Sequence, residues 1–241
     1  MLFQHVQFKT GQRVHAIGQD FETLHILNSG FIKTRLIDEL GNEQVLSFPM
    51  KGDILGLDAI DTSHYTSEAI TLSDCDLILV PFKKFSALSR VHIELENILF
   101  CVISRELARE REMIGMLGGL GAEARVARFL VALSARYATM GYSGNLFNLR
   151  MTREEIGSYL GITLETVSRT LTSFRKMGLI TVNRRAIGIQ DTEMLKNLRR
   201  LPRSRPRTRP VSDALPMGGP SRRVNRSALA DVNDVCRSPG N

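Results

Sequence analysis

The sequence predicts an α+β fold in which an N-terminal antiparallel β domain precedes a long helix and a C-terminal helix pair with a β-hairpin. Three patterns predict it. Short β-branched segments alternate with glycines over residues 8–82, an amphipathic pattern covers residues 92–118, and helical and hairpin patterns follow within residues 119–197. We therefore expect folded domains at residues 1–91 and 119–197, with a helix between them.

Four segments of the N-terminal domain have the composition of strands. They are residues 23–27, 31–36, 44–48 and 77–80, and the glycines between them mark turns. Many short strands at near-regular spacing are typical of an antiparallel sandwich or barrel.

Residues 92–118 predict one long amphipathic helix. Its apolar residues recur three, four or seven positions apart, at Leu95, Leu99, Val102, Ile103, Leu107, Ile114 and Leu117. Such spacing, with charged residues between, favours pairing with a second copy of the chain. A surface helix packed on its own sheet is the alternative.

Three glycines within residues 118–121 predict a hinge before the next helix, which we expect at residues 123–140. That helix should bury Val126, Phe129, Leu130 and Leu133. No lysine followed by serine or threonine accompanies the glycines, so they do not form a phosphate-binding loop.

Two short helices are expected between Thr152 and Gly178. Thr152 and Glu155 have the spacing of a capping box, which predicts a helix start near Arg153. Gly161 then supplies the turn, and Thr163 caps the second helix.

The second helix of this pair has a polar face suited to DNA. Val167, Leu171 and Phe174 point inward with Ile156 and Leu160. The opposite face carries Leu164, Glu165, Ser168, Arg169 and Thr172. Arginine can donate two bonds to guanine, glutamate can accept from cytosine, and serine suits either partner. A solvated helix pair with no ligand is the alternative.

The chain ends in a predicted wing and a basic tail. Segments 179–182 and 187–189 flank a turn with two arginines, which is either a phosphate contact or a solvated turn. Residues 198–241 are expected to be a disordered Arg/Pro-rich tail. Ten basic residues against five acidic ones in residues 150–201 favour a polyanionic partner, although a basic surface can also serve solubility alone.

The run from Glu165 to Arg169 resembles the recognition helix of the Crp/Fnr regulators, in the Glu-x-x-Ser-Arg form of the Fnr and FixK branch. The resemblance covers roughly residues 8–195. It implies a jelly roll in the N-terminal domain, a homodimer formed through the long helix and a winged helix-turn-helix. It further implies a transcription regulator, most simply an activator, which binds double-stranded DNA at a TTGAT-N4-ATCAA palindrome. The expected DNA-binding residues are Thr152, Arg153, Thr163, Leu164, Glu165, Ser168, Arg169, Thr172, Arg175 and Lys176.

The resemblance also implies a partner and a class of control. The loop 38–43 is similar to a family surface that touches RNA polymerase. Nucleotide-binding members use an arginine-serine pair where this chain has Tyr65-Thr66. Oxygen-sensing members hold an iron-sulfur cluster, but the sequence starts after the extension with three of the four cysteines, and Ile78 stands at the fourth position. We expect no cofactor and no metal, as in FixK-type regulators.

Several alternatives stay open at this stage. Haem ligation by Cys75 or a histidine, or an intersubunit bridge through Cys101, would give redox control, and an unidentified effector in the jelly roll would give ligand control. Cys75 is otherwise expected to be a packed strand residue. No signal peptide, membrane span, disulfide spacing or catalytic motif stands out, so we expect a cytoplasmic protein that is not an enzyme.

Overall fold

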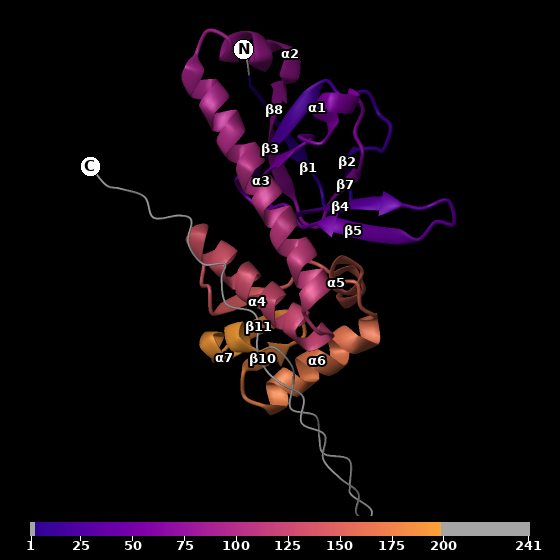
Figure 1. The fold of residues 1–241 in the computed structure, drawn as a ribbon, viewed down its shortest axis with the longest axis vertical. Coiled ribbons are helices and arrows are strands. Elements are labelled where there is room, and N and C mark those ends of the chain that lie inside the picture. Colours follow the sequence, from indigo (N-terminus) through magenta and orange to yellow (C-terminus); the bar gives the residue numbers. More distant parts are fainter. Residues whose placement is uncertain (1–2, 199–241) are drawn as a thin grey trace, which may run out of the picture. The chain divides into compact units, whose positions relative to one another are not determined.

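A computed structural model describes residues 3–198, and the predicted disordered tail therefore lies outside the described residues, except for Leu198. The fold class expected from the sequence is confirmed. Figure 1 shows the N-terminal strands in indigo and purple, the long helix in magenta and the C-terminal helices in orange.

The N-terminal domain contains two four-stranded antiparallel sheets. One has the order β1 (Gln4–Phe8), β8 (Cys75–Pro81), β3 (Thr23–Ser29) and β6 (Ile54–Leu55). The other has the order β2 (Arg13–His15), β7 (Glu68–Thr71), β4 (Ile32–Ile37) and β5 (Glu43–Ser47). Neighbouring strands that are distant in sequence are typical of a jelly roll.

A small apolar core lies within this domain. Leu27, Ile32, Leu55, Ala69 and Leu77 are all buried in one cluster. Cys75 belongs to the same cluster, which confirms its expected role as a packed strand residue. Two short helices, α1 (Ala59–Thr62) and α2 (Phe82–Ser89), complete the domain.

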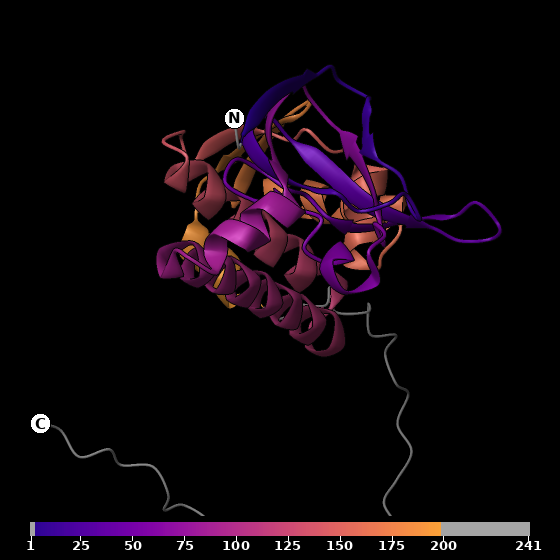
Figure 2. The same ribbon diagram turned by 90° about the horizontal axis from the view of Figure 1, so that it is seen from above.

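The long helix is α3, Ile93–Gly119, and none of its residues is buried within the single chain. Figure 2, viewed from above, shows α3 in magenta along one side of the ribbon. Gly118 and Gly119 belong to the last turn of α3, so the expected four-residue hinge is only partly right. A glycine costs little at a helix end, so Gly118 and Gly119 keep the helical conformation, and the break consists of Leu120 and Gly121, which are extended.

The C-terminal part begins with α4, Ala122–Thr139, whose four expected inward residues are buried. It continues with β9 (Leu146–Asn148), α5 (Arg153–Leu160), α6 (Leu164–Lys176), β10 (Ile180–Asn183), β11 (Ala186–Ile189) and α7 (Thr192–Asn197). The three strands form one antiparallel sheet in the order β10-β11-β9. The helix pair and the hairpin thus form a winged helix-turn-helix. None of the helices in the described part has the length and apolar character needed to cross a bilayer.

Candidate nucleic-acid interface

The first helix of the pair, α5, begins where its capping box requires. The Thr152 hydroxyl accepts a hydrogen bond from the Glu155 amide at 3.1 Å, and the Glu155 carboxylate accepts one from the Thr152 amide at 2.7 Å. Both bonds satisfy amides that have no partner inside the helix. They fix the N-terminal end of α5.

The turn between α5 and α6 depends on two glycines. Gly161 ends α5 in the left-handed region, with φ of 62°. Gly157 is buried inside α5, and a Cβ there would lie 2.7 Å from the Ile162 carbonyl oxygen. The absence of a side chain at Gly157 therefore lets the turn fold back against α5. The sequence signal for this role is a glycine inside a helical pattern, where it otherwise lowers helix propensity.

The second helix, α6, is divided into a buried apolar face and a polar face. Thr163 caps it by accepting from the Thr166 amide at 3.3 Å. Val167 and Phe174 are completely buried and Leu171 is nearly so, in the same core as Ile156 and Leu160. Because the apolar face of α6 packs into the core, the polar side chains of α6 lie on the opposite face.

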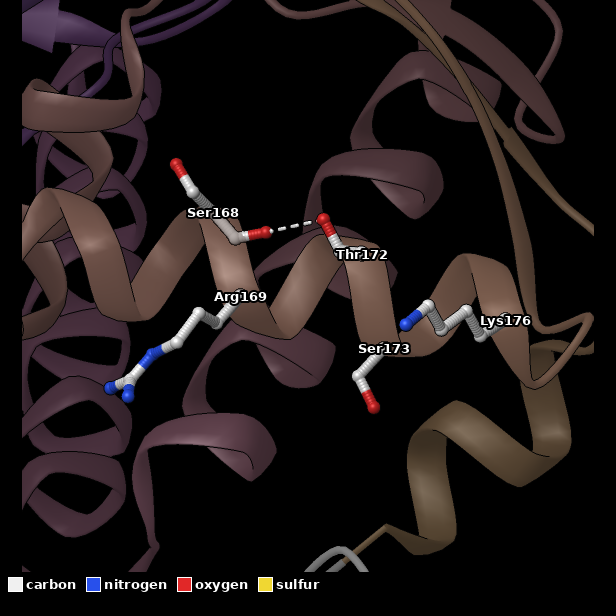
Figure 3. Close-up of a pocket in the computed structure, with 5 residues that line it drawn as sticks. All are labelled: Ser168, Arg169, Thr172, Ser173 and Lys176. Atoms are coloured by element: carbon white, nitrogen blue, oxygen red, sulfur yellow. Dashed lines mark hydrogen bonds between the residues drawn. The ribbon is translucent and has the colours of Figure 1, made fainter.

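The exposed polar face carries the residues expected to read DNA. Figure 3 shows Ser168, Arg169, Thr172, Ser173 and Lys176 lining a shallow hollow along α6. Leu164, Glu165, Arg169, Thr172, Arg175 and Lys176 are exposed, as are Thr152, Arg153 and Thr163, while Ser168 is half-buried. The structure therefore brings Ser168, Arg169, Thr172 and Lys176 together in one hollow, and it leaves the other predicted site residues exposed on the two helices and at their N-terminal caps.

Hydrogen bonds arrange these side chains with respect to one another. Arg153 of α5 donates to the Ser168 hydroxyl at 3.2 Å, and Arg169 donates to the Thr166 hydroxyl at 3.2 Å. Thr172 donates to the Ser168 carbonyl at 2.9 Å (Figure 3). Arg153 thereby links the N-terminal end of α5 to the middle of α6.

Glu165 lies in the first turn of α6 and is held in its ionised form. Hydrogen bonds from its own backbone amide and from the Thr163 hydroxyl lower the pKa of its carboxyl group. An ionised carboxylate is an acceptor only, so Glu165 presents acceptor oxygens next to the donors of Arg169.

The hairpin β10–β11 has the two arginines expected at its tip, but its turn has only two residues, because the strands extend to Asn183 and Ala186. Asn183 pairs with Ala186, and Arg184 and Arg185 form the exposed tip. Arg184 has φ of 54°, in the region that two-residue hairpin turns require. Arg185 donates to the Arg150 carbonyl at 3.3 Å, so one of the two arginines is tied to the backbone that follows β9.

Arg125 of α4 has a positioning role that the sequence did not indicate. Its guanidinium donates to the carbonyls of Leu117 at 2.6 Å and Leu120 at 3.0 Å, where α3 ends. It also donates to the carbonyl of Leu160, at the end of α5, at 3.0 Å. One side chain therefore satisfies carbonyls at the ends of two helices. Nothing in a local pattern distinguishes this arginine from a solvated one.

The N-terminal domain does not fit a cyclic nucleotide at the position that the family resemblance indicates. The Thr66 hydroxyl donates to the Asp58 carboxylate, and the Tyr65 hydroxyl donates to the Thr23 carbonyl at 2.5 Å. A phosphate there would meet a carboxylate, and residues 52–82 contain no lysine or arginine to balance it.

Cys75 is likewise unsuited to act as a thiolate ligand. Its thiol donates toward the carbonyls of Phe31 and Ser73, at 3.4 and 3.2 Å. Burial raises the pKa of this thiol, which keeps it protonated.

Comparison with known proteins matches both halves of the chain. Residues 124–198 match the Crp-like helix-turn-helix domain, and residues 5–92 match the cyclic nucleotide-binding domain. The transcriptional regulatory protein Btr of Bordetella pertussis is 36% identical over 195 residues, which are 81% of each chain. The fumarate and nitrate reduction regulatory protein of Escherichia coli K12 is 37% identical over 188 residues, 78% of this chain and 75% of that protein.

The fold has a counterpart among solved structures. FixK2 from Bradyrhizobium japonicum superposes with a TM-score of 0.76 at 23% identity, covering 84% of this chain and 100% of that chain. The relatives are regulators and not enzymes. Together with the two-domain match and the exposed polar face of α6, they establish that the chain belongs to the Crp/Fnr family of DNA-binding transcription regulators.

Proposed function

We propose that the chain binds, as a homodimer, a palindrome of the form TTGAT-N4-ATCAA and activates transcription there. The observation that carries the proposal is the set of exposed Glu165 and Arg169 and half-buried Ser168 on the face of α6 opposite its buried apolar face. Arg169 would donate to guanine, Glu165 would accept from the cytosine amino group, and Ser168 would bond either base of a neighbouring pair.

Most of the remaining site residues are assigned to the DNA backbone. Thr152, Arg153 and Thr163 lie at helix starts, where amides and hydroxyls suit phosphate oxygens. Arg175 and Lys176 lie at the other end of α6 and provide cations. Leu164 and Thr172 are exposed beside the base-reading residues and suit apolar or hydroxyl contacts in the groove. Arg184 at the wing tip is a further phosphate candidate.

The exposed apolar side chains of α3 support the homodimer. Phe100, Ile103, Leu107 and Ile114 are between 38 and 70% exposed in the single chain and follow spacings of three, four and seven residues. Such a stripe is typical of a helix that packs against its own copy. A two-fold dimer places two α6 helices at half-sites about one DNA turn apart.

The loop between β4 and β5 supports contact with RNA polymerase. Asp38 accepts from the amides of Leu40 at 2.9 Å and Asn42 at 2.8 Å, which orders the turn. Leu40 is 87% exposed at its tip. An ordered loop with an exposed apolar residue suits a protein contact. Low-oxygen or related metabolic control in the cytoplasm is the physiological role that the resemblance to the Fnr and FixK branch implies.

Selection of bound sequences from a random duplex pool tests this function. Purified protein should enrich the palindrome above, with half-sites separated by four base pairs. Running the selection with and without oxygen tests how that control is exerted: the expectation of no redox cofactor predicts enrichment of the same site in both. Enrichment of unrelated sequences would contradict the proposed specificity.

A second candidate is a regulator of the same fold gated by a small effector. His15 and His25 are buried in the jelly roll with ring centroids 5.6 Å apart, and the Nδ1 atom of each has no hydrogen-bond partner in the described part of the chain. Burial lowers the pKa of both imidazoles to about 4, so both are neutral near pH 7. A metabolite-induced shift of the melting temperature, lost in His15→Phe, would favour this candidate.

A further inference from the structure

We infer that Ser158 and Glu155 are positioning residues for DNA recognition. They fasten the helix-turn-helix to strands β5 and β4 of the jelly roll. They thereby set the spacing between the two half-sites that the dimer accepts. The inference rests on the proposed function, and it concerns the back of α5 rather than the surface that meets DNA.

Ser158 bonds to the free edge of a sheet. Strand β5 is the last strand of its sheet, so the outward-facing groups of its backbone have no strand partner. The Ser158 hydroxyl donates to the Glu43 carbonyl at 3.0 Å and accepts from the Val45 amide at 2.8 Å. Gln44 of the same strand donates to the Ser158 carbonyl at 2.7 Å. Three hydrogen bonds thus converge on one residue of α5.

The two carboxylate oxygens of Glu155 accept hydrogen bonds from two different elements, the start of α5 and strand β4. Oε2 accepts from the Thr152 amide and closes the capping box. Oε1 accepts from Lys33 Nζ of β4 at 2.7 Å, and the same ammonium donates to Glu43 at 2.7 Å. The side chains of Lys33 and Glu155 are only 11 and 15% exposed. The carboxylate that starts α5 therefore also ties α5 to the jelly roll.

The ion pair of Lys33 with Glu43 continues as a chain of ion pairs across the sheet to β2. Glu43 also pairs with Arg35, and Arg35 pairs with Glu68 at 2.6 Å. Glu68 in turn pairs with Arg13 of β2 at 3.2 Å. Burial alone would lower the pKa of Lys33, but its hydrogen bonds with Glu155 and Glu43 outweigh burial and raise it. Lys33 therefore stays charged at neutral pH.

Apolar packing accompanies the polar contact. Phe48 follows the end of β5. Its ring centroid lies 5.1 Å from that of Tyr159 and 6.1 Å from that of Phe129. Val45, Phe48 and Met50 belong to the same buried cluster as the core of α4, α5 and α6. Apolar packing is non-directional, whereas the bonds of Ser158 and Glu155 specify one position of α5 along β5.

This contact controls where α6 lies in a dimer. The helix α3 that carries the dimer stripe follows the jelly roll directly in the chain, and α5 packs on α6. Fixing α5 to β5 therefore fixes each α6 relative to the dimer axis. If the contact were loosened, each helix-turn-helix could rotate relative to the jelly roll. Binding a palindrome with a four-base spacer would then cost more conformational entropy, and palindromes with other spacers would be bound relatively better.

The test compares palindromes whose half-sites are separated by three, four or five base pairs. Four purified full-length proteins are measured: wild type, Ser158→Ala, Glu155→Gln and the control Ser89→Ala, which removes a hydroxyl bonded only within α2. Glu155→Gln keeps the capping box, because glutamine also serves at that position, and it removes the charge opposite Lys33.

We expect the first two variants to bind the four-base palindrome about three- to tenfold more weakly than wild type, as one or two lost hydrogen bonds allow. Their affinity for the other two spacings should change less, so the preference for four bases falls. Ser89→Ala should keep the wild-type preference. An unchanged preference in both variants, or an equal loss on all three duplexes, would overturn the inference.

Hydrogen exchange separates this inference from the proposed function. The Val45 amide, which Ser158 protects in the free protein, should exchange faster in Ser158→Ala and at the wild-type rate in Ser89→Ala. Unchanged exchange at Val45 would refute the contact itself. A wild type that binds all duplexes equally, with faster exchange in Ser158→Ala, would contradict the proposed function while leaving the contact in place, and would remove the role in spacing.

Discussion

Single side chains on α6 differ in the kind of information they can take from DNA. Arg169 projects a two-pronged donor from the middle of the exposed face, whereas Arg175 and Lys176 lie in the last turn. Contacts with base edges distinguish sequences, while contacts with phosphate strengthen binding to every sequence. Substitutions at these positions should therefore have different signatures.

Arg169→Ala should lose about 1–3 kcal/mol of preference for the palindrome over a shuffled duplex, the usual worth of a bidentate base contact. Competition binding at one salt concentration measures it. Arg175→Ala is the matched control, because loss of a phosphate contact should weaken both duplexes alike and, in a separate salt series, lower the salt slope by about one. Equal losses on both duplexes in Arg169→Ala would argue against base readout by this residue.

The two cysteines of the described part should react at very different rates. Cys75 is buried with a raised thiol pKa, and Cys101 is exposed on α3. Because the thiolate is the reactive form, brief alkylation at pH 8 should modify Cys101 and leave Cys75 unmodified until the protein unfolds. Peptide mass spectrometry reads both sites. Rapid modification of Cys75 in the native protein would contradict its packing.

At the scale of elements, α5 and α6 could be predicted well because their signals are local. The capping box, the Gly161 turn, the Thr163 cap and the wing turn each depend on residues within a few positions of one another. The strands β1, β2, β6, β7 and β9 were missed, because they are short and take their stability from partners far along the chain, such as Phe147 of β9 with Ile187 of β11.

Gly157→Ala should destabilise the helix pair, since the new Cβ would press on the Ile162 carbonyl at 2.7 Å. Overpacking of this kind costs about 1–3 kcal/mol, which thermal unfolding would detect as a lower melting temperature. Gly119→Ala, at the end of α3, has open space around its Cβ and should be neutral or slightly stabilising. A Gly157→Ala protein as stable as wild type would show that the turn does not need this close approach.

At the scale of the whole molecule, the sequence predicted both domains and the helix between them but not how the jelly roll meets α5. Ser158 lies 115 positions from its acceptor Glu43, and Glu155 lies 122 positions from Lys33. No periodicity or spacing relates such residues. The same holds for Arg125, which bonds carbonyls at the end of α3 and also the Leu160 carbonyl at the end of α5, 35 positions away.

The homodimer makes a prediction of its own. Ile103→Glu together with Leu107→Glu would place two charges in the apolar stripe of α3, so the dimer should dissociate at micromolar concentration and palindrome binding should fall with it. Analytical ultracentrifugation measures the mass. Val91→Glu, at an even more exposed apolar position just before α3, is the control and should leave the dimer intact. A double variant that stays dimeric would place the interface elsewhere.

One titration tests recognition of DNA by α6 most directly. The purified full-length protein is titrated against a labelled palindrome and against a shuffled duplex of equal length, at one fixed salt concentration. Readout of base edges by Glu165, Ser168 and Arg169 predicts that the palindrome binds at least about a thousandfold more tightly, as specific sites generally do. Equal affinity for the two duplexes would contradict sequence-specific recognition by this helix.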